Sequence, residues 1–342
     1  MQQHPHVAVA LLNYNGRNHL EKYLPTVLSL TYPNLSVWVI DNASTDDSVS
    51  FLQQQYPQVQ LVVNPLNGGF AQGYNMGLRH IESPYIFLLN TDVAVTPNLL
   101  QPLVDSMEKN AGMAAIQPRI CADTNRHYFE YAGAAGGYMD ILGYPFCRGR
   151  LFESVEKDEG QYNDEQLVFW ASGAAMLMRK KLFDDAGGFY PYFFMHNEEI
   201  DWCWRMLNKG YKIGYNGHEV VYHLGGGSLA KENPRKTWFN FRNNLIMISR
   251  NMPLGWLFLL LPLRFGLDIV AALQMLLAGN NSNALAVMKA WVAYVNWLVK
   301  PGNHKWPGNR KSFAGPGRYS GSVVWQHFVK KHQRAADFYN GY

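Results

Sequence analysis

The segment YIFLLNTDVAV, residues 85–95, gives the clearest indication of the fold. Its first half is a short, continuously apolar run of the kind that forms a strand buried on both faces. The run ends in Asn90, Thr91 and Asp92, although an ionised carboxylate taken out of water costs far more free energy than an apolar side chain does. Such a carboxylate either caps a turn before Pro97 or shares its charge with a ligand.

Apolar runs and helical patterns alternate through the first hundred residues. We predict strands at residues 7–12, 36–41, 59–63 and 85–89, and helices at residues 17–30, 44–55 and 70–81. This alternation is typical of a mostly parallel sheet that is built from right-handed strand–helix–strand units and covered by helices. The predicted fold class is therefore α/β. Ligands of such sheets bind beyond the carboxyl ends of the strands, and those ends are polar in this sequence.

The length and composition of the chain favour a globular protein with a large core. The chain has 342 residues, of which 48% are hydrophobic and 16% are charged. Its three cysteines are odd in number and show no CxxC spacing, so they predict neither a disulfide framework nor a zinc site and suit a reducing compartment. The N-terminal apolar run has no basic residues before it, so we interpret it as a first strand and not as a signal peptide.

The C-terminal part combines apolar and basic residues. Nine Lys or Arg residues and no acids lie between Asp268 and Asp337, together with the apolar segments 253–277 and 284–299. This combination favours an anionic membrane surface over nucleic acid as the partner. Segment 253–277 is long enough to span a bilayer, but Arg264 and Asp268 would each cost about 2.5–3.5 kcal/mol at its centre. An interfacial or re-entrant helix, a true span, and a water-soluble helical subdomain or oligomer interface all remain open.

A second acidic cluster opens a predicted helix at residues 198–208, with Asn197 as its N-cap and Gly210 just after its end. Glu198, Glu199 and Asp201 lie in its first turn, and their mutual repulsion should raise the pKa of at least one of them, as a general base requires. The alternative is a solvated helix start with an ion pair to Arg205. The aromatic flanks FYPYFFMH and WCW argue against a solvated surface, although core packing explains them as well as sugar binding does.

Two further motifs are weak by themselves. The segment NGGFAQGYNMG, residues 67–77, is glycine-rich and could let backbone N–H groups approach an anion. It is neither a dinucleotide-binding fingerprint nor a P-loop, which argues against a dehydrogenase or a P-loop NTPase. A lone histidine such as His223 is more often structural than a ligand.

In order along residues 6–250, the motifs VALLNYNG, VIDNASTDDS, NGGFAQGYNMG, FLLNTDV, SGAAMLMRK, NEEIDWCWR and VYHLGGGS resemble the inverting glycosyltransferases of family 2. The resemblance is greatest to the branch with rhamnosyltransferases, and it implies the GT-A fold. It divides the chain into a glycosyltransferase domain, residues 1–250, and a C-terminal helical, basic and membrane-associating region, residues 251–342.

The resemblance also implies roles for individual residues. Asp92 and His223 would bind Mg²⁺ or Mn²⁺, with Asn90 where the common Asp-x-Asp pattern has its first Asp. Glu199 would be the catalytic base, although the family usually has Asp there, with Asp201 in reserve and Glu198 beside it. The nucleotide-sugar site would comprise Asn13, Tyr14, Asp41, Asn67, Gly69, Asn75, Asn90, Thr91 and Asp92. The acceptor side would comprise Trp170, Gly173 and Trp202. Among these, Tyr14 can stack on the base, and Asp41 can accept hydrogen bonds from base or ribose unless it merely caps the next helix.

The expected activity is transfer of a sugar from a nucleoside-diphosphate donor, UDP- or dTDP-linked, to a hydroxyl of a glycan or lipid-linked acceptor in cell-surface polysaccharide synthesis. The expected location is the cytoplasm, at the inner face of the plasma membrane. Two alternatives are a sugar-1-phosphate nucleotidyltransferase, whose basic glycine-rich signature is missing near the first strand, and a catalytically silent membrane scaffold, which the departures at Asn90 and Glu199 would suit.

Overall fold

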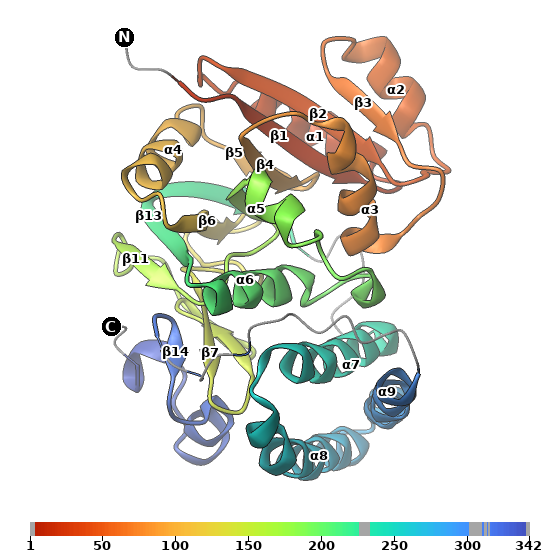
Figure 1. The fold of residues 1–342 in the computed structure, drawn as a ribbon, viewed down its shortest axis with the longest axis vertical. Coiled ribbons are helices and arrows are strands. Elements are labelled where there is room, and N and C mark those ends of the chain that lie inside the picture. The colour runs from red at the N-terminus through yellow and green to blue at the C-terminus, as the bar shows by residue number, and fades with distance from the viewer. Residues whose placement is uncertain (1–3, 226–232, 301–309, 311–312, 314, 340–342) are drawn as a thin grey trace.

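A large mixed sheet forms the centre of the computed structural model, which describes residues 4–225, 233–300, 310, 313 and 315–339 (Figure 1). Its strand order is β11-β13-β6-β12-β4-β1-β2-β3, and β5 pairs with β13. The strands are β1 Val7–Asn13, β2 Leu35–Asp41, β3 Gln60–Val63, β4 Tyr85–Asn90, β5 Val93–Val95, β6 Met113–Ala122, β11 Glu165–Val168, β12 Ala175–Arg179 and β13 Lys212–His223.

Strands β3, β2, β1 and β4 are parallel neighbours, as predicted, whereas β12 runs antiparallel to both β4 and β6. The register pairs Asn13 with Asp41 and Leu12 with Asn90. The polar ends of the three central strands therefore lie side by side at one edge of the sheet.

Helices cover both faces of the sheet (Figure 1). Alternate residues of β1 belong to different hydrophobic cores: Val7, Val9 and Leu11 pack with the α1 side, and Ala8 and Ala10 pack with the α3 side. This two-sided burial explains the continuous apolar runs in the sequence. The helices are α1 Arg17–Leu28, α2 Ser48–Gln55, α3 Gly69–Gly77, α4 Leu100–Lys109, α5 Lys180–Asp185, α6 Glu198–Lys209, α7 Pro234–Asn251, α8 Leu254–Leu277 and α9 Asn281–Val299.

The prediction of the second helix was wrong at its start. The helix begins at Ser48 and not at Ser44, because side chains at the strand ends hold the intervening residues in a turn. The Asp41 carboxylate accepts a hydrogen bond from the backbone N–H of Ser44 at 2.8 Å, and the Asn15 side chain accepts one from Thr45 at 2.7 Å. These local bonds compete with helix formation.

A smaller sheet occupies the region for which the sequence predicted no elements. Its order is β10-β9-β8-β7-β14, with β7 Gly137–Asp140, β8 Pro145–Cys147, β9 Arg150–Leu151, β10 Ser154–Val155 and β14 Arg318–Tyr319. Strand β14 comes from the C-terminal part of the chain, and the buried Asp140 carboxylate accepts a hydrogen bond from the backbone N–H of Val323 at 2.9 Å. The division of the chain at residue 250 stays a prediction, and the packing across it is extensive.

Helices α8 and α9 lie at the bottom of the molecule in Figure 1, beyond α7. Among the described residues, α8 is the one helix long and apolar enough to cross a membrane. Its two charged residues, Arg264 and Asp268, are each only 1% exposed, because they face the protein and contact Tyr144, Leu142 and Trp291. The polar residues that interrupt the apolar segment are therefore turned inward.

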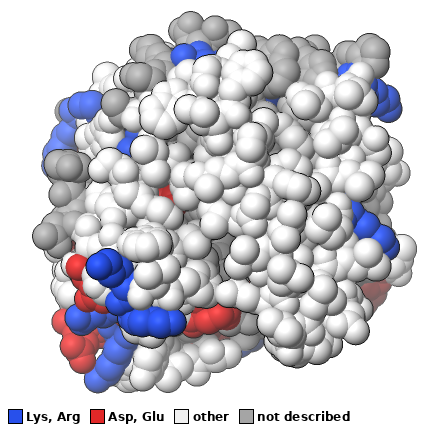
Figure 2. Space-filling model, turned by 90° about the horizontal axis from the view of Figure 1, so that it is seen from below, with Lys and Arg blue, Asp and Glu red and all other residues white. Residues whose placement is uncertain are grey.

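The outer face of α8 and α9 is apolar. We call this surface the α8–α9 face, and Figure 2, which views the molecule from below, shows it largely without charge, with charged groups toward its edges. The face consists of Leu254, Trp256, Phe258, Leu259, Leu263, Phe265, Val270, Leu273, Leu276, Leu277, Leu285, Met288, Val292, Val295, Leu298 and Val299. Patches of this kind mark protein or membrane contacts.

Candidate active site

Asp92 and His223 meet at the carboxyl end of β4. Strand β5 pairs with the end of β13 and places Val93 opposite His223, so the two side chains converge. Asp92 Oδ1 lies 3.1 Å from His223 Nε2, and both residues are buried. Burial alone would raise the pKa of Asp92, but the hydrogen bond and charge of His223 outweigh it and hold the pKa below its usual range. Asp92 therefore stays ionised.

Glu130 completes this group on the other side of the imidazole ring. Its Oε2 lies 3.1 Å from His223 Nδ1, and it is buried. Burial alone would lower the pKa of His223, but the carboxylates of Asp92 and Glu130 raise it to about 10. No motif pointed to Glu130, because its contact with His223 joins residues far apart in the sequence. We call Asp92, His223 and Glu130 the Asp92 group.

The polar ends of β1 and β2 bind each other. Asp41 has no exposed surface, and its two carboxylate oxygens accept hydrogen bonds from Asn13 Nδ2 at 2.9 Å and from the backbone N–H of Ser44 at 2.8 Å. These contacts hold the turn between β2 and α2, and they do not cap α2, whose N-cap position is Asp47. Tyr14 is 50% exposed beside them and remains available for stacking.

The glycine-rich segment contacts the loop before α6. Asn67 Oδ1 accepts hydrogen bonds from Asn42 Nδ2 and from the backbone N–H of Gly69, each at 2.9 Å. Gly69 has a φ of +70°, and a Cβ there would come within 2.3 Å of the carbonyl oxygen of Phe194. Asn75 makes two hydrogen bonds with the backbone of Phe189, at 2.8 and 2.9 Å, which is a structural role. Asn67 and Gly69 therefore shape the glycine-rich segment, and Asn75 fastens it to the backbone of Phe189.

Glu198 and Glu199 form the second acidic group, at the start of α6, and we call them the α6 pair. Each has one buried carboxylate oxygen, Oε2, with no hydrogen-bond partner. Burial raises the pKa of Glu199 to about 7, and burial together with the charge of Glu199 raises the pKa of Glu198 well above its usual range. Glu198 is 3% exposed, whereas Glu199 is partly accessible. Glu199 is thus the carboxylate that can exchange a proton near neutral pH.

The geometry gives Asp201 a structural role. Its Oδ1 accepts hydrogen bonds from Arg250 Nε at 3.0 Å and from Asn251 Nδ2 at 2.8 Å, and its Oδ2 accepts one from Arg205 Nε at 2.9 Å. These partners hold the pKa of the carboxyl below its usual range in spite of full burial. Asp201 therefore fastens α6 to α7, which argues against its use as a reserve base.

A sequence model of glycosyl transferase family 2 matches residues 8–187, more than half of the chain. The chain belongs to glycosyl transferase family 2. The matched residues include the strand ends around Asp41 and Asp92, while Glu199 and His223 lie beyond them. The comparisons give no support to a nucleotidyltransferase.

Relatives of this family 2 glycosyltransferase include enzymes of glycan synthesis. An N-acetylglucosaminyl-diphospho-decaprenol L-rhamnosyltransferase of Mycobacterium tuberculosis is 26% identical over 240 residues, which cover 66% of this chain and 78% of the relative. An uncharacterized glycosyltransferase of Haemophilus influenzae is 27% identical over 241 residues, 67% of this chain and 69% of the relative.

Two solved structures confirm the GT-A type of α/β fold. GalNAc-T7, crystallised with UDP, GalNAc and Mn²⁺, superposes with a TM-score of 0.56 at 14% identity, over 74% of this chain and 49% of that one. The mannosyltransferase PcManGT of Pyrobaculum calidifontis, in complex with GDP-Man and Mn²⁺, superposes with a TM-score of 0.53 at 15% identity, over 90% of this chain and 84% of that one.

The residues predicted for the acceptor side of this glycosyltransferase lie in two different places. Gly173 lies beside Glu199, since a Cβ there would stand 3.8 Å from Glu199 Cβ and 2.8 Å from the Phe70 ring. Trp170 and Trp202 are instead core residues: Trp202 has no exposed surface, and Trp170 Nε1 donates to the backbone oxygen of Tyr138 at 3.0 Å. Their assignment to the acceptor is not supported, because core packing alone explains the aromatic flanks.

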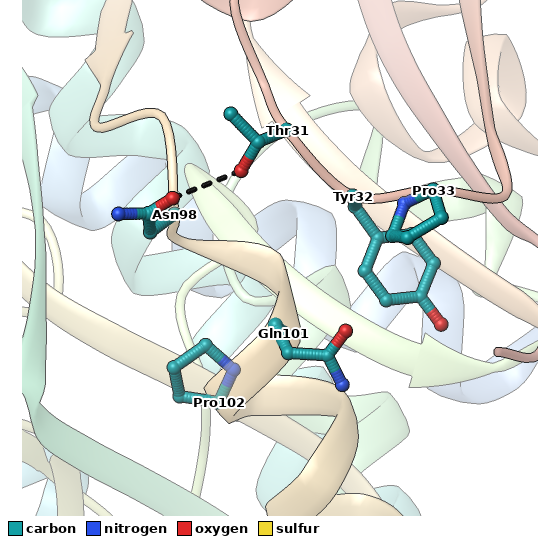
Figure 3. Close-up of a pocket in the computed structure, with 6 residues that line it drawn as sticks. All are labelled: Thr31, Tyr32, Pro33, Asn98, Gln101 and Pro102. Carbon is teal, nitrogen blue, oxygen red and sulfur yellow. Dashed lines mark hydrogen bonds between the residues drawn. The ribbon is translucent and has the colours of Figure 1, made fainter. Parts of the chain in front are cut away.

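A hollow of about 420 Å³ lies elsewhere on the glycosyltransferase (Figure 3). It lies beside the amino end of β2 and the first turn of α4, and its lining includes no acidic or basic side chain. Its lining residues are Thr31, Tyr32, Pro33, Asn98, Gln101 and Pro102. A nucleoside diphosphate needs cations or a metal, so this hollow is not the donor site.

Proposed function

We propose that this glycosyltransferase is metal-dependent, inverts the anomeric configuration, and uses Glu199 as its general base. The observation that carries the proposal is the state of the Glu199 carboxylate, which has a pKa raised to about 7 and an oxygen without a hydrogen-bond partner. A general base works best when its pKa lies near the operating pH. Burial at the start of α6 provides that pKa.

The residues that would hold the metal are Asp92 and His223. Their Oδ1 and Nε2 atoms face each other, while Glu130 lies on the opposite ring nitrogen, where a carboxylate commonly orients a metal-binding histidine. Because the raised pKa of His223 keeps its imidazole protonated, a metal bound there would have to replace the proton on Nε2. An oxygen and an imidazole nitrogen suit Mn²⁺ or Mg²⁺. Among the described residues no three His, Cys, Asp or Glu side chains could hold an ion alone, so the donor diphosphate and water would supply the other ligands. When bound, the cation would neutralise charge on the departing diphosphate.

The chain's own residues account for the proton and for the alignment. Glu199 takes the proton of the acceptor hydroxyl. At the same time the hydroxyl oxygen forms a bond to the anomeric carbon, and the bond between that carbon and the diphosphate oxygen breaks. Attack from the face opposite the diphosphate inverts the configuration. The residues at the ends of β1 and β4, with Tyr14 exposed among them, would hold the nucleotide in line with that attack.

We further propose a lipid-linked glycan acceptor and a UDP- or dTDP-sugar donor. The support for the acceptor is the relative from Mycobacterium tuberculosis, whose name specifies a diphospho-decaprenol-linked sugar. The support for a nucleoside-diphosphate donor is the ligands of the two superposed structures. The identity of the sugar does not follow from either.

The membrane is the proposed location because the α8–α9 face would otherwise be exposed to water. Arg264 and Asp268 bind the rest of the protein, so a span through the bilayer would break those contacts and leave both charges in hydrocarbon. A helix pair lying in the interface of the cytoplasmic leaflet keeps these contacts and buries the apolar face. Of the open alternatives, the interfacial arrangement is the one that the contacts favour.

Thermal unfolding with UDP, dTDP and GDP, each alone and with Mn²⁺ or Mg²⁺, tests the proposal. A ligand at about a hundred times its dissociation constant adds about 2.7 kcal/mol of stability. We expect one nucleotide to stabilise the protein only with metal, and Asp92→Ala to abolish the shift. Absence of a shift with all three would favour the silent scaffold.

A further inference from the structure

The loop just before the α6 pair has an unusual backbone. Phe194, His196 and Asn197 have positive φ angles of 64°, 68° and 70°, a conformation in which side chains other than glycine are strained. Asn197 occupies the N-cap position of α6, yet its side chain makes no capping hydrogen bond. Something outside the loop must therefore hold it in place.

Asn243, a fully buried residue of α7, supplies most of that support. Its side-chain nitrogen Nδ2 lies 3.0, 2.7 and 2.8 Å from the backbone oxygens of Phe193, Met195 and His196. The two hydrogens of one amide are thus shared by three backbone carbonyls of the loop, and the last of these carbonyls lies two residues before Glu198. Few side chains could replace such an amide, because the position is fully buried and needs a donor for these carbonyls.

Arg242 holds Asn243 in turn. Arg242 Nε donates to Asn243 Oδ1 at 2.8 Å, which fixes the amide so that its nitrogen faces the loop, and Nη2 donates to the backbone oxygens of Tyr192 and Phe193 at 2.9 and 3.0 Å. The guanidinium lies 4.2 Å from the centre of the Trp238 ring. All the donors come from consecutive residues of a single rigid helix.

The other side of the loop contacts the glycine-rich segment. The backbone N–H of Ala71 donates to the Phe194 oxygen at 3.2 Å, and Gly69 approaches the same oxygen closely. The loop is consequently clamped between the predicted donor side and α7. Its position fixes where α6 begins and hence where Glu199 points.

We propose that Asn243, oriented by Arg242, is a positioning residue for the reaction: it sets the location of the Glu199 carboxylate relative to the acceptor hydroxyl. This inference rests on the proposed role of Glu199 as the base. A shift of about 1 Å in a reacting group can cost about 10²-fold in rate, so a loosened loop should slow the chemical step without weakening the donor site.

The test compares Asn243→Asp with Asn244→Asp in the full chain. Asn243→Asp keeps the shape but replaces the donating nitrogen by an oxygen that faces three carbonyls. Asn244 is the matched control, since it is the next residue of α7, is buried, and donates to Gly143 O at 2.8 Å, away from the loop. Turnover is measured as release of nucleoside diphosphate from a donor sugar, and donor binding as stabilisation by UDP, dTDP or GDP, whichever stabilises the wild type, with Mn²⁺.

We expect Asn243→Asp to lower kcat by about 10²-fold while KM for the donor and the nucleotide-dependent stabilisation stay within about threefold of wild type. In the Glu199→Gln background the same substitution should have almost no further effect, because the carboxylate that it positions is already absent. Asn243→Gln, which retains a donor, should recover part of the rate.

Equal losses of kcat in the two Asp variants, or a loss that adds fully to that of Glu199→Gln, would show that Asn243 serves stability alone and would overturn the proposal. Failure of the base assignment looks different, because Glu199→Gln by itself would then keep its turnover.

Discussion

The two acidic groups of the site are both largely shielded from water but have opposite protonation behaviour. In the Asp92 group, a histidine between two carboxylates holds the pKa of Asp92 and Glu130 below their usual ranges. In the α6 pair no cation from the described part of the chain offsets the effect of burial, and the pKa of both carboxyls is raised. The shifts differ in direction because His223 is a charged partner of Asp92 and Glu130, whereas the causes of the shifts in the α6 pair include no cation.

This contrast indicates how one fold can assign two tasks to the same functional group. A carboxylate that must stay ionised as a ligand is given a cationic neighbour, and one that must take up a proton is left without one. Asp201 provides an internal comparison, since it lies only two residues after Glu199 and is kept ionised by Arg205 and Arg250. Sequence proximity therefore says little about which behaviour a carboxyl will have.

The largest expected effect comes from removing the carboxylate that lacks partners. Glu199→Gln should lower kcat by about 10²–10⁴-fold, the usual contribution of a general base, while stabilisation by nucleotide and Mn²⁺ is unchanged. The measurement is steady-state kinetics beside thermal unfolding. Glu198→Gln is the matched control with a smaller expected loss, and a greater loss in that variant would transfer the base to Glu198.

The next effect concerns stability. Asp201→Ala removes the carboxylate that Arg205 and Arg250 share, and loss of one partner from a buried ion pair costs about 3–5 kcal/mol of unfolding free energy. Chemical denaturation measures it. An unfolding free energy within about 1 kcal/mol of wild type would mean that the α6–α7 junction relaxes and that Asp201 is not the fastening residue.

Local sequence patterns were sufficient for one half of the molecule. The strands at residues 7–13, 35–41 and 85–90 follow from uninterrupted apolar runs, since both faces of the sheet are covered. Asp92 was identified because a charge at the end of such a strand needs an explanation, and its contact with His223 agrees with the resemblance to family 2.

The other half depends on contacts between distant residues, and these left no local signal. Glu130 meets His223 across 93 positions, and Asn243 meets His196 across 47. The smaller sheet pairs Arg318 with Met139, which lie far apart in the sequence. Several of its strands have only two residues, too few to show an alternating pattern. Composition could not show that Trp170 and Trp202 are buried, because aromatic residues of a core and of a sugar site have the same composition.

The pH dependence should differ between wild type and Glu199→Gln. Glu199 must be ionised to accept a proton, so kcat/KM should fall about tenfold per pH unit below its pKa of about 7. Its folded pKa is raised from 4.5, so the folded state binds the extra proton and loses stability as pH rises from about 4.5 to about 7.

Glu199→Gln should therefore be more stable than wild type at pH 8, with the gain disappearing below pH 4.5. Denaturation curves at several pH values measure this difference. A pH-independent difference would mean that the pKa of Glu199 is ordinary, and the contrast with Asp92 would then fail.

The smallest expected effect is on membrane binding by the C-terminal helices. Lys289 is the single charged residue of α9, a helix described throughout, and it is exposed beside Met288 and Val292. If the α8–α9 face meets an anionic bilayer, Lys289→Ala should weaken binding to vesicles containing phosphatidylglycerol by about 1 kcal/mol, close to fivefold, and leave binding to neutral phosphatidylcholine vesicles unchanged.

Lys109→Ala is the matched control, because it removes an exposed cation from α4, at the opposite end of the molecule in Figure 1. Equal losses in both variants would mean that binding follows net charge and not this face. Absence of binding by wild type to either vesicle would leave a second copy of the chain as the partner that covers the apolar residues.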